Sequence, residues 1–383
     1  MIPYGRQDIR QEDIDAVEAV LRSDFLTQGP AVPAFERAVA ERAGAAHAVA
    51  ANSATSALHV ACLALELGPG DRLWTSPITF VASANCGRYC GAEVDFVDID
   101  PATHNMCPDG LAEKLEAAER EGRLPKVLVP VHLCGRSCEM DRIGALARRY
   151  GVRVIEDASH AVGGRFDGAP VGCCAHSDIT VFSFHPVKIV TSAEGGMALT
   201  GDAELAGRMA LLRSHGVTRD PDLMTRAPDG PWYYQQVELG WNYRMTDLQA
   251  ALGLSQLSRL DDYVAARNAI AWDYDAAFAD LALSVAPEDP RILSARHLYV
   301  IRLEAAARHR AVFEALREEG IGVNLHYIPV HLQPYYARLG FGRGDFPAAE
   351  DYYARAISLP LYPTMGEDRR DAVIEAVRRT VGT

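Results

Sequence analysis

Three segments place polar groups directly beside apolar runs. The apolar part of VRVIEDASHA ends in Glu156 and Asp157, and the run DITVFSFHPVK ends in Lys188. A third segment, NSATS at 52–56, opens an apolar helical pattern with hydroxyl and amide side chains. Ligands of doubly wound sheets bind at the carboxyl ends of the strands, and a helix start offers backbone amides to a phosphate. A carboxylate, an amine and a phosphate seat are therefore expected to meet at one edge of a sheet.

This combination of groups fits pyridoxal phosphate. The cofactor requires a lysine that forms a Schiff base with its aldehyde, an acidic partner for its pyridine nitrogen and a seat for its phosphate. Taken alone, each residue has an ordinary explanation, since Lys188 could be a surface lysine and Asp157 could cap the turn after its strand. Glu156 is expected to point to the other side of the sheet, because side chains alternate along a strand.

The elements that would position these groups alternate along the chain. Apolar patterns at 8–24, 33–45 and 52–67 predict helices. Five short apolar runs bounded by turns then predict strands: VDFVDID, VLVPVHL, VRVIED, DITVFSF and GGMALT. A helix at 140–151 lies among them. Short buried strands alternating with helices predict an α/β fold with a mostly parallel sheet flanked by helices.

The pattern changes near residue 245. Beyond it, a long, nearly continuous helical stretch, a strand and two helices are predicted at 246–281, 297–303, 308–320 and 367–381. A chain of 383 residues is also too long for one minimal core. We therefore predict a large cofactor-binding domain over 1–245, which includes the N-terminal helix, and a small α+β domain over 246–383. The stretch 218–236, rich in Pro, Asp and aromatic residues, is predicted to be a functional loop.

Composition argues against several classes of partner. The formal net charge is −13 and the pI is about 5.4, which disfavours binding to nucleic acid or to an anionic membrane. The N-terminus shows no signal peptide, and no apolar run reaches the length of a membrane span. The eight cysteines form no CxxC pair, so reduced thiols and a cytoplasmic location are expected.

Two other patterns are weak. The glycines of GFGRGD (340–345) follow no predicted strand, so a surface turn is expected there instead of a nucleotide loop. His326 and His331 lie in an extended segment that contains proline, and no metal site is predicted.

The order of the segments resembles the sugar aminotransferases of the DegT/DnrJ/EryC1/StrS family, which are fold type I pyridoxal-phosphate enzymes. The resemblance covers essentially the whole chain. Any one matching segment would be a weak signal, whereas nine in the same order are specific. The nine are LTQGPAVPAFE (26–36), NSATSAL (52–58), SPITFVASAN (76–85), VPVHLCG (129–135), EDASHAVG (156–163), FSFHPVK (182–188), EGGM (194–197), LGWNYRMTDLQAALGLSQL (239–257) and SLPLYPTM (358–365).

The resemblance implies two catalytic residues. Lys188 corresponds to the lysine that forms the Schiff base and later moves the proton, and Asp157 corresponds to the partner of the ring nitrogen. Phe80 matches the aromatic residue that stacks on the cofactor ring. Read alone, Phe80 would be assigned to the core.

The resemblance also implies how the rest of the cofactor is held. Ala54, Thr55 and Ser183 match the phosphate seat, although relatives commonly have Gly-Thr where this chain has Ala54–Thr55. His160 stands where many relatives carry Gln and could donate to the phenolic oxygen. Asn242 matches a residue that reaches across a dimer interface, which implies a homodimer with shared active sites; read alone it is a turn residue.

Within the family, the chain resembles most the branch that aminates C4 of a UDP-linked 4-keto-6-deoxy-N-acetyl-L-hexosamine in pseudaminic acid synthesis. The segments LRSHG (212–216) and GIGVNLHYIPVHLQPYYARLGF (320–341) carry this likeness. It implies L-glutamate as the amino donor and pyridoxamine phosphate as the intermediate form of the cofactor. The implied sugar-nucleotide contacts are Tyr4, Thr27, Asn324, His326 and Tyr327.

Other functions stay open at this stage. The nearest is an aminotransferase for another nucleotide 4-keto or 3-keto deoxysugar, such as UDP-4-keto-6-deoxy-GlcNAc or a dTDP-keto sugar. A related C3-dehydratase is disfavoured because those enzymes replace the Schiff-base lysine with histidine, and Lys188 is a lysine. A cofactor-binding regulator is disfavoured because the chain has no DNA-binding appendage. A nicotinamide oxidoreductase is disfavoured because the chain has no strand-linked GxGxxG motif.

Overall fold

A seven-stranded sheet forms the centre of the protein in the computed structural model, which describes residues 1–382. The strand order is β1-β9-β8-β5-β4-β2-β3. The last five strands of that order are mutually parallel, and β9 runs antiparallel to both β8 and β1. The strands are β1 (His47–Ala51), β2 (Arg72–Thr75), β3 (Glu93–Phe96), β4 (Val127–Val129), β5 (Arg153–Asp157), β8 (Ile179–Ser183) and β9 (Gly196–Thr200). The predicted mostly parallel sheet is confirmed.

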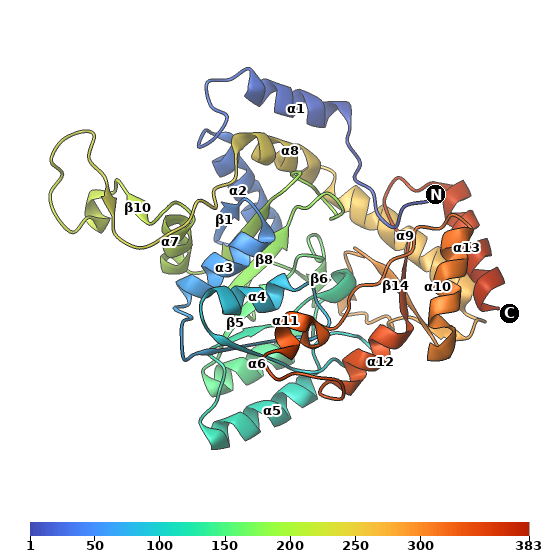
Figure 1. Ribbon diagram of the computed structural model, residues 1–383. Helices are drawn as coiled ribbons and strands as arrows, with labels where there is room; N and C mark the ends of the chain where they lie inside the picture. The colour runs from blue at the N-terminus through green and yellow to red at the C-terminus, as the bar shows by residue number, and fades with distance from the viewer. Residues whose placement is uncertain (383) are drawn as a thin grey trace.

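Helices cover both faces of this sheet (Figure 1). The helices of this part of the chain are α1 (Gln11–Leu21), α2 (Ala31–Ala43), α3 (Ala54–Ala64), α4 (Ala82–Tyr89), α5 (Pro108–Glu121), α6 (Met140–Tyr150), α7 (Ala203–Leu212), α8 (Asp247–Leu257) and α9 (Leu260–Phe278). Helix α1 lies outside this layer of helices and packs on α8 (Figure 1). Alternate residues of one strand enter different cores: Leu73 of β2 joins the core under α3 and α4, and Trp74 joins the core under α5 and α6. Burial on both faces explains why the strand sequences read as continuous apolar runs.

The nearly continuous helical stretch predicted for 246–281 forms two helices, α8 and α9, with a short break at Ser258 and Arg259. Arg259, in the break, has φ −104° and ψ 10°, outside the helical range. Its guanidinium turns to the buried carboxylate of Asp13 in α1. A tertiary ion pair therefore interrupts a stretch whose local sequence favours helix.

The C-terminal part has its own three-stranded antiparallel sheet, β12 (Leu283–Ser284), β14 (Tyr299–Leu303) and β15 (Ala356–Leu359), covered by α10 (His309–Glu318) and α13 (Glu367–Val381). The predicted division at 245/246 stays a prediction, and several contacts join residues on its two sides. Helix α8 packs on α1 and α2, and Ile2 pairs with Ile321.

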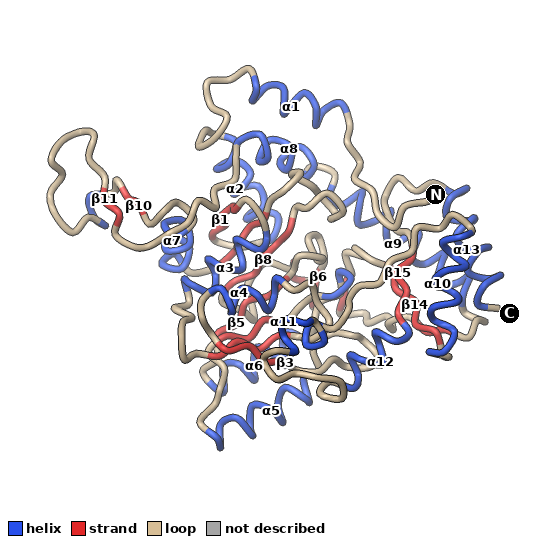
Figure 2. Tube along the Cα trace, in the orientation of Figure 1, coloured by secondary structure: helices blue, strands red, loops and turns tan. Residues whose placement is uncertain are grey.

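Smaller elements complete the chain. A small sheet joins β13 to β6 and β7, and two short helices precede β15 (Figure 2). These elements are β6 (Arg165–Phe166), β7 (Ala169–Pro170), β13 (Ile292–Leu293), α11 (Pro334–Ala337) and α12 (Pro347–Arg355), with 3-10 turns at Leu133–Gly135, Pro221–Leu223, Ala306–Arg308 and Val330–Leu332.

An arm projects from the body between α7 and α8 (Figures 1 and 2). It contains the short hairpin β10 (Val217–Thr218) and β11 (Gln235–Gln236) and includes the Pro-rich loop predicted at 218–236. Trp232 and Leu239 on this arm are 71% and 73% exposed. Within residues 1–382, no helix is both long enough and apolar enough to cross a membrane.

Asp13 anchors α1 to the body although its side chain is almost fully buried. Ser255 Oγ and Gln256 Nε2 donate to its carboxylate at 2.6 and 2.7 Å, and the Arg259 guanidinium donates to both oxygens. Burial alone would raise the pKa of Asp13, but these hydrogen bonds hold it below the usual value.

Replacing Asp13 with Ala should therefore destabilise the protein by about 3 kcal/mol at neutral pH, since Arg259 loses its partner. A lowered carboxyl pKa stabilises the folded state above the unfolded pKa, so this difference should shrink as the pH falls through the pKa of folded Asp13. Urea denaturation of Asp13→Ala at several pH values measures it, with exposed Asp15→Ala as the control. An equal loss in both variants would contradict the anchoring role.

Candidate active site

A cavity of about 450 Å³ opens at the carboxyl ends of β5 and β8. It brings together most of the residues predicted from the sequence: Tyr4, Ala54, Thr55, Phe80, Asp157, His160, Ser183, Lys188, His326 and Tyr327. They come from both halves of the chain, so the cavity exists only in the folded protein. A second cavity, of about 370 Å³, lies among α2, α9 and the β6–β7 hairpin and contains no lysine.

Lys188 lies in the turn that follows β8, where its backbone N–H donates to His185 O at 2.9 Å. Burial lowers the pKa of Lys188 to about 8, and the negative charge of Asp157 opposes this shift. The amine is therefore partly neutral just above neutral pH, as a nucleophilic lysine requires.

Asp157 is the last residue of β5 and is buried at the cavity wall. Its Oδ1 accepts the backbone N–H of Ser159 at 3.1 Å, and its Oδ2 accepts the hydroxyl of Ser83 at 2.6 Å. The carboxylate thus has a defined orientation before any ligand is considered.

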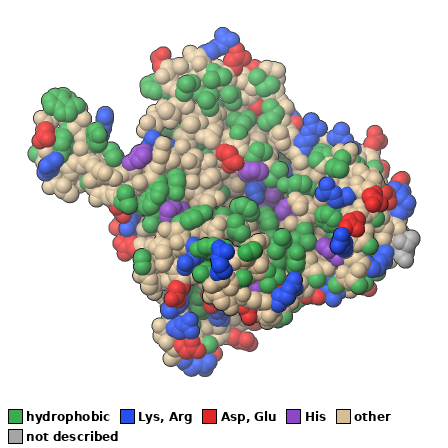
Figure 3. Space-filling model, in the orientation of Figure 1, with side chains coloured by type: hydrophobic (Ala, Val, Ile, Leu, Met, Phe, Trp, Pro, Cys, Tyr) green, Lys and Arg blue, Asp and Glu red, His purple; other side chains and the backbone are tan. Residues whose placement is uncertain are grey.

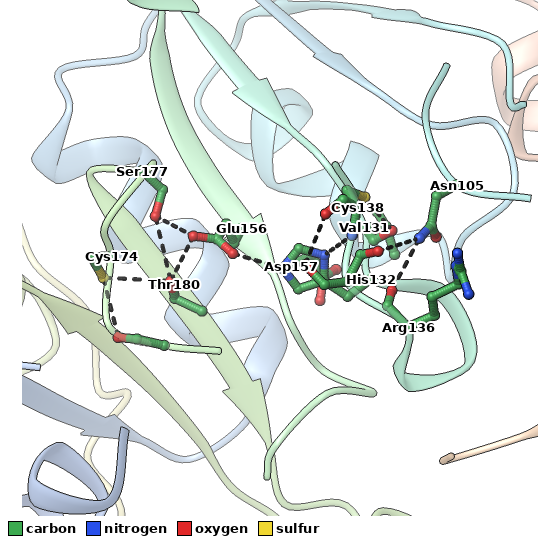
Figure 4. Close-up of polar contacts among 12 residues, drawn as sticks. Asn105, Val131, His132, Arg136, Cys138, Glu156, Asp157, Cys174, Ser177 and Thr180 are labelled. Carbon is green, nitrogen blue, oxygen red and sulfur yellow. Dashed lines mark hydrogen bonds and ion pairs between the residues drawn. The ribbon is translucent and has the colours of Figure 1, made fainter. Parts of the chain in front are cut away.

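Glu156 does not line the cavity, as strand alternation predicts. Figure 4 shows its carboxylate beside Ser177 and Thr180. Its carboxylate accepts from His132 Nε2 at 2.7 Å, from Thr180 Oγ1 at 3.3 Å and from Ser177 Oγ. The N–H of Cys138 donates to His132 Nδ1 at 3.1 Å, which places the imidazole proton on Nε2. Burial would raise the pKa of Glu156, but these donors lower it. Only the second carboxylate of the Glu-Asp pair therefore serves the cavity.

The start of α3 fits a phosphate. Ser53 caps the helix by accepting the N–H of Ser56 at 3.1 Å, which leaves the first helical amides, those of Ala54 and Thr55, without intrahelical acceptors. Ser183, at the end of β8, lines the same cavity. A side chain at Gly196 would collide with the backbone of Ala54, so glycine there allows the helix start to sit directly on β9.

His160 and Tyr327 form a hydrogen-bonded pair in the cavity wall. The N–H of Cys134 donates to His160 Nδ1 at 3.3 Å, so the ring proton lies on Nε2, 3.1 Å from the Tyr327 hydroxyl. Burial and then the charge of Lys188 hold the pKa of His160 well below its usual value. His160 is thus neutral and donates to Tyr327 Oη, which leaves the tyrosine hydrogen free for another acceptor.

Aromatic side chains form the part of the cavity wall next to Tyr327. Phe80 is 58% exposed, with its ring centroid 6.3 Å from that of Tyr327. Tyr4 packs on His326 at 5.3 Å, and His326 Nδ1 lies 2.8 Å from Ser358 Oγ. Burial and the charge of Lys188 lower the pKa of His326 to about 4, so this wall is uncharged near neutral pH.

Three predicted residues lie outside the cavity of the single chain. Asn242 is exposed at the base of the arm, and its backbone oxygen lies 3.4 Å from Asn52 Nδ2. Thr27 is exposed and pairs with Thr246, whereas the Asn324 side chain accepts the N–H of Leu325. The roles assigned to these three residues stay predictions.

The cavity also contains residues that the sequence did not single out. Ser53, Thr79 and Glu194 lie inside the matching segments, so a closer reading of those segments could have found them. His297 lies two residues before β14 and packs on His160 with ring centroids 4.4 Å apart. No local pattern marks His297, because only the fold brings it to the cavity.

An amine, a carboxylate, a flat aromatic face and a helix start in one cavity match the parts of pyridoxal phosphate. Within residues 1–382, no three His, Cys, Asp or Glu side chains are grouped so that they could hold a metal ion. The profile of the DegT/DnrJ/EryC1/StrS aminotransferase family matches residues 7–378. The chain belongs to this family.

Two named relatives are similar in sequence to this protein along nearly its whole length. The chain is 42% identical to the spore coat polysaccharide biosynthesis protein SpsC of Bacillus subtilis, over 99% of this chain and 97% of the relative. It is 36% identical, over 99% of both chains, to the UDP-4-amino-4,6-dideoxy-N-acetyl-beta-L-altrosamine transaminase of Campylobacter jejuni.

Solved structures agree as well. PseC of Helicobacter pylori, an aminotransferase involved in the biosynthesis of pseudoaminic acid, superposes with a TM-score of 0.91 at 31% identity, over 100% of this chain and 99% of PseC. A sugar aminotransferase homologue of Streptococcus pneumoniae, solved in its PMP form, gives 0.90 at 30% identity over 99% of both chains. The protein is a fold type I, pyridoxal-phosphate-dependent sugar aminotransferase.

The lowered pKa of Lys188 predicts how the cofactor-free protein responds to pH. Below about pH 8 the folded protein carries a partly buried ammonium group at Lys188, which destabilises it. This penalty disappears as the pH rises from about 8 past 10.5, where the unfolded lysine also loses its proton. Lys188→Met should therefore stabilise the cofactor-free protein at pH 7, by on the order of 1 kcal/mol. Thermal unfolding at pH 7 and pH 10 tests this, and a constant difference between the two pH values would contradict it.

Proposed function

We propose that the protein transfers an amino group from L-glutamate to C4 of a UDP-linked 4-keto-6-deoxy-N-acetyl-L-hexosamine, in pseudaminic acid-type sugar biosynthesis. The observation that carries this proposal is the 36% identity to the Campylobacter jejuni transaminase over 99% of both chains. The likeness to PseC supports the same substrate class. The proposed location is the cytoplasm, where the eight unpaired cysteines would stay reduced.

When bound, pyridoxal phosphate supplies an electron sink that lets an amine and a carbonyl exchange places. Lys188 would hold the cofactor covalently and, after the donor amine displaces it, carry the proton between the two reacting carbons. A pKa of about 8 suits this task, because the amine can both accept and release a proton near neutral pH. Asp157 would hold the proton of the ring nitrogen.

The remaining cavity residues would bind the two ends of the cofactor and the sugar. Ala54, Thr55 and Ser183 are placed to donate to the phosphate, and the exposed face of Phe80 is placed to stack on the ring. Tyr4, His326 and Tyr327 would contact the sugar nucleotide. Since His160 already donates to Tyr327, we assign the contact with the phenolic oxygen to the His160–Tyr327 pair.

We also propose a homodimer in which the arm of one subunit completes the other subunit's site. The exposed apolar side chains over α1 and on the arm form patches on the face shown in Figure 3. They are Ile14, Leu21, Phe25 and Leu26 near α1, and Leu223, Trp232, Tyr234 and Leu239 on the arm, each at least half exposed. Patches of this kind are typical of surfaces covered by a partner. A second subunit would also explain why Asn242, at the base of the arm, faces solvent in the single chain.

A panel of keto sugars tests the substrate. The enzyme should aminate the UDP-linked L-configured 4-keto sugar with kcat/KM at least about tenfold above that for UDP-4-keto-6-deoxy-GlcNAc or for dTDP-linked 3-keto and 4-keto sugars. NMR of the product should place the amine at C4, and L-glutamate should exceed L-aspartate and L-glutamine as donor. Preference for another sugar, or an amine at C3, would replace the proposed substrate while leaving aminotransferase chemistry in place.

Mixing two inactive variants tests the shared site. Lys188→Ala and Asn242→Ala should each lose most activity as homodimers. Mixed dimers should regain it, because one of their two sites combines an intact Lys188 with an intact Asn242 from the other subunit. Activity after mixing, with subunit exchange verified by native mass spectrometry, measures the effect. Verified mixed dimers that stay inactive would refute the sharing of Asn242.

A further inference from the structure

Ser83 contacts the carboxylate of Asp157 from a position buried beneath the cavity. It is the second residue of α4 and is fully buried. Its hydroxyl oxygen lies 2.6 Å from Asp157 Oδ2, 2.7 Å from Thr79 Oγ1 and 3.3 Å from Phe80 O. The cavity lining includes Thr79, Phe80 and Asp157, so this hydroxyl joins three wall positions from behind.

Counting hydrogens gives this contact a direction. An ionised carboxylate only accepts hydrogen bonds, so the single hydrogen of Ser83 goes to Asp157. Thr79 must then be the donor in its 2.7 Å contact with Ser83. The contact between Ser83 and Phe80 O, at 3.3 Å, is the ordinary bond of a serine in the first turn of a helix, and it is much longer than the bond to Asp157.

We propose that Ser83 is a positioning residue for the amino-transfer reaction, and that the chain Thr79 to Ser83 to Asp157 fixes the Asp157 carboxylate against the cofactor ring nitrogen. This inference rests on the proposed role of Asp157. Ser83 itself does not line the cavity, and it acts through the carboxylate alone.

The segment 79–83 thus positions two parts of the site, the aromatic ring of Phe80 and the carboxylate of Asp157. Phe80 presents its ring to the cavity, and Ser83, three residues later, holds the carboxylate. Ser159 N–H holds the other oxygen, so both oxygens of Asp157 have a protein donor and the group cannot rotate without losing one. An orientation fixed before cofactor binding avoids reorganisation of the carboxylate during the reaction.

Four variants of the holoenzyme test the proposal. Ser83→Ala removes the hydroxyl that donates to Asp157, and Ser83→Thr retains a hydroxyl at this position. Thr79→Val removes only the hydroxyl that donates to Ser83. Thr75→Val is the matched control, because Thr75 is fully buried and its hydroxyl donates to a backbone oxygen, Val129 O, outside the cavity. Asp157→Asn serves as the reference. The readouts are the pH midpoint of the absorption change of the bound cofactor, the cofactor Kd, and the rate of the half-reaction with glutamate.

Ser83→Ala should slow the half-reaction by about 10- to 100-fold. It should also move the spectral midpoint in the same direction as Asp157→Asn and by a smaller amount. Ser83→Thr, if it binds cofactor, should restore the midpoint. Thr79→Val should give a smaller shift of the same sign, and adding it to Ser83→Ala should have no further effect on the midpoint. Thr75→Val should leave the midpoint unchanged.

Other outcomes distinguish a failure of the role of Ser83 from a failure of the role of Asp157. A normal midpoint and rate in Ser83→Ala, together with a strong defect in Asp157→Asn, would overturn the role of Ser83 alone. A silent Asp157→Asn would overturn the assignment of Asp157 and this inference with it. If Ser83→Thr does not fold, additive midpoint shifts of Thr79→Val and Ser83→Ala would overturn the hydroxyl chain.

Discussion

The site depends on one electrostatic constraint, namely that an amine and a carboxylate must share one partly buried cavity. Burial lowers the pKa of Lys188 to about 8, and the charge of Asp157 limits that shift. The parallel pairing of β5 with β8 places Asp157 opposite Val181, so the carboxylate and the turn that carries Lys188 leave the sheet at the same edge. Without a charged Asp157, the amine would lose the one nearby charge that opposes its neutralisation.

The same constraint applies to Glu156 and Asp157, of which only Asp157 faces the cavity. Asp157 faces the cavity and accepts one hydroxyl and one amide, whereas Glu156 faces His132, Ser177 and Thr180 on the far side of the strand. Strand alternation separates the two charges, and each has its own donors. A second carboxylate directly beside Asp157 would repel it and would also raise the pKa of the amine.

The local sequence was sufficient to predict the reactive residues, but it could not predict the tertiary contacts around them. Lys188, Asp157 and the helix start at Ala54 could be predicted because each stands beside an apolar run whose type is clear. The break at Arg259 could not, because it depends on Asp13, some 246 positions away. His297 and the bond from Ser83 to Asp157 also depend on tertiary contacts. Asn242, Thr27 and Asn324 were predicted by resemblance alone, and none of them lines the cavity of one chain.

The contact of Gly196 with the start of α3 divides the cavity into a rigid wall and an exchangeable wall. Glycine at this position lets Ala54 rest directly on a central strand, so the phosphate seat cannot be reshaped without disturbing the sheet. Tyr4, His326 and Tyr327 lie instead on segments outside the central sheet. Engineering of a new sugar preference should therefore begin at Tyr4 and His326, because Tyr327 is also proposed to contact the cofactor.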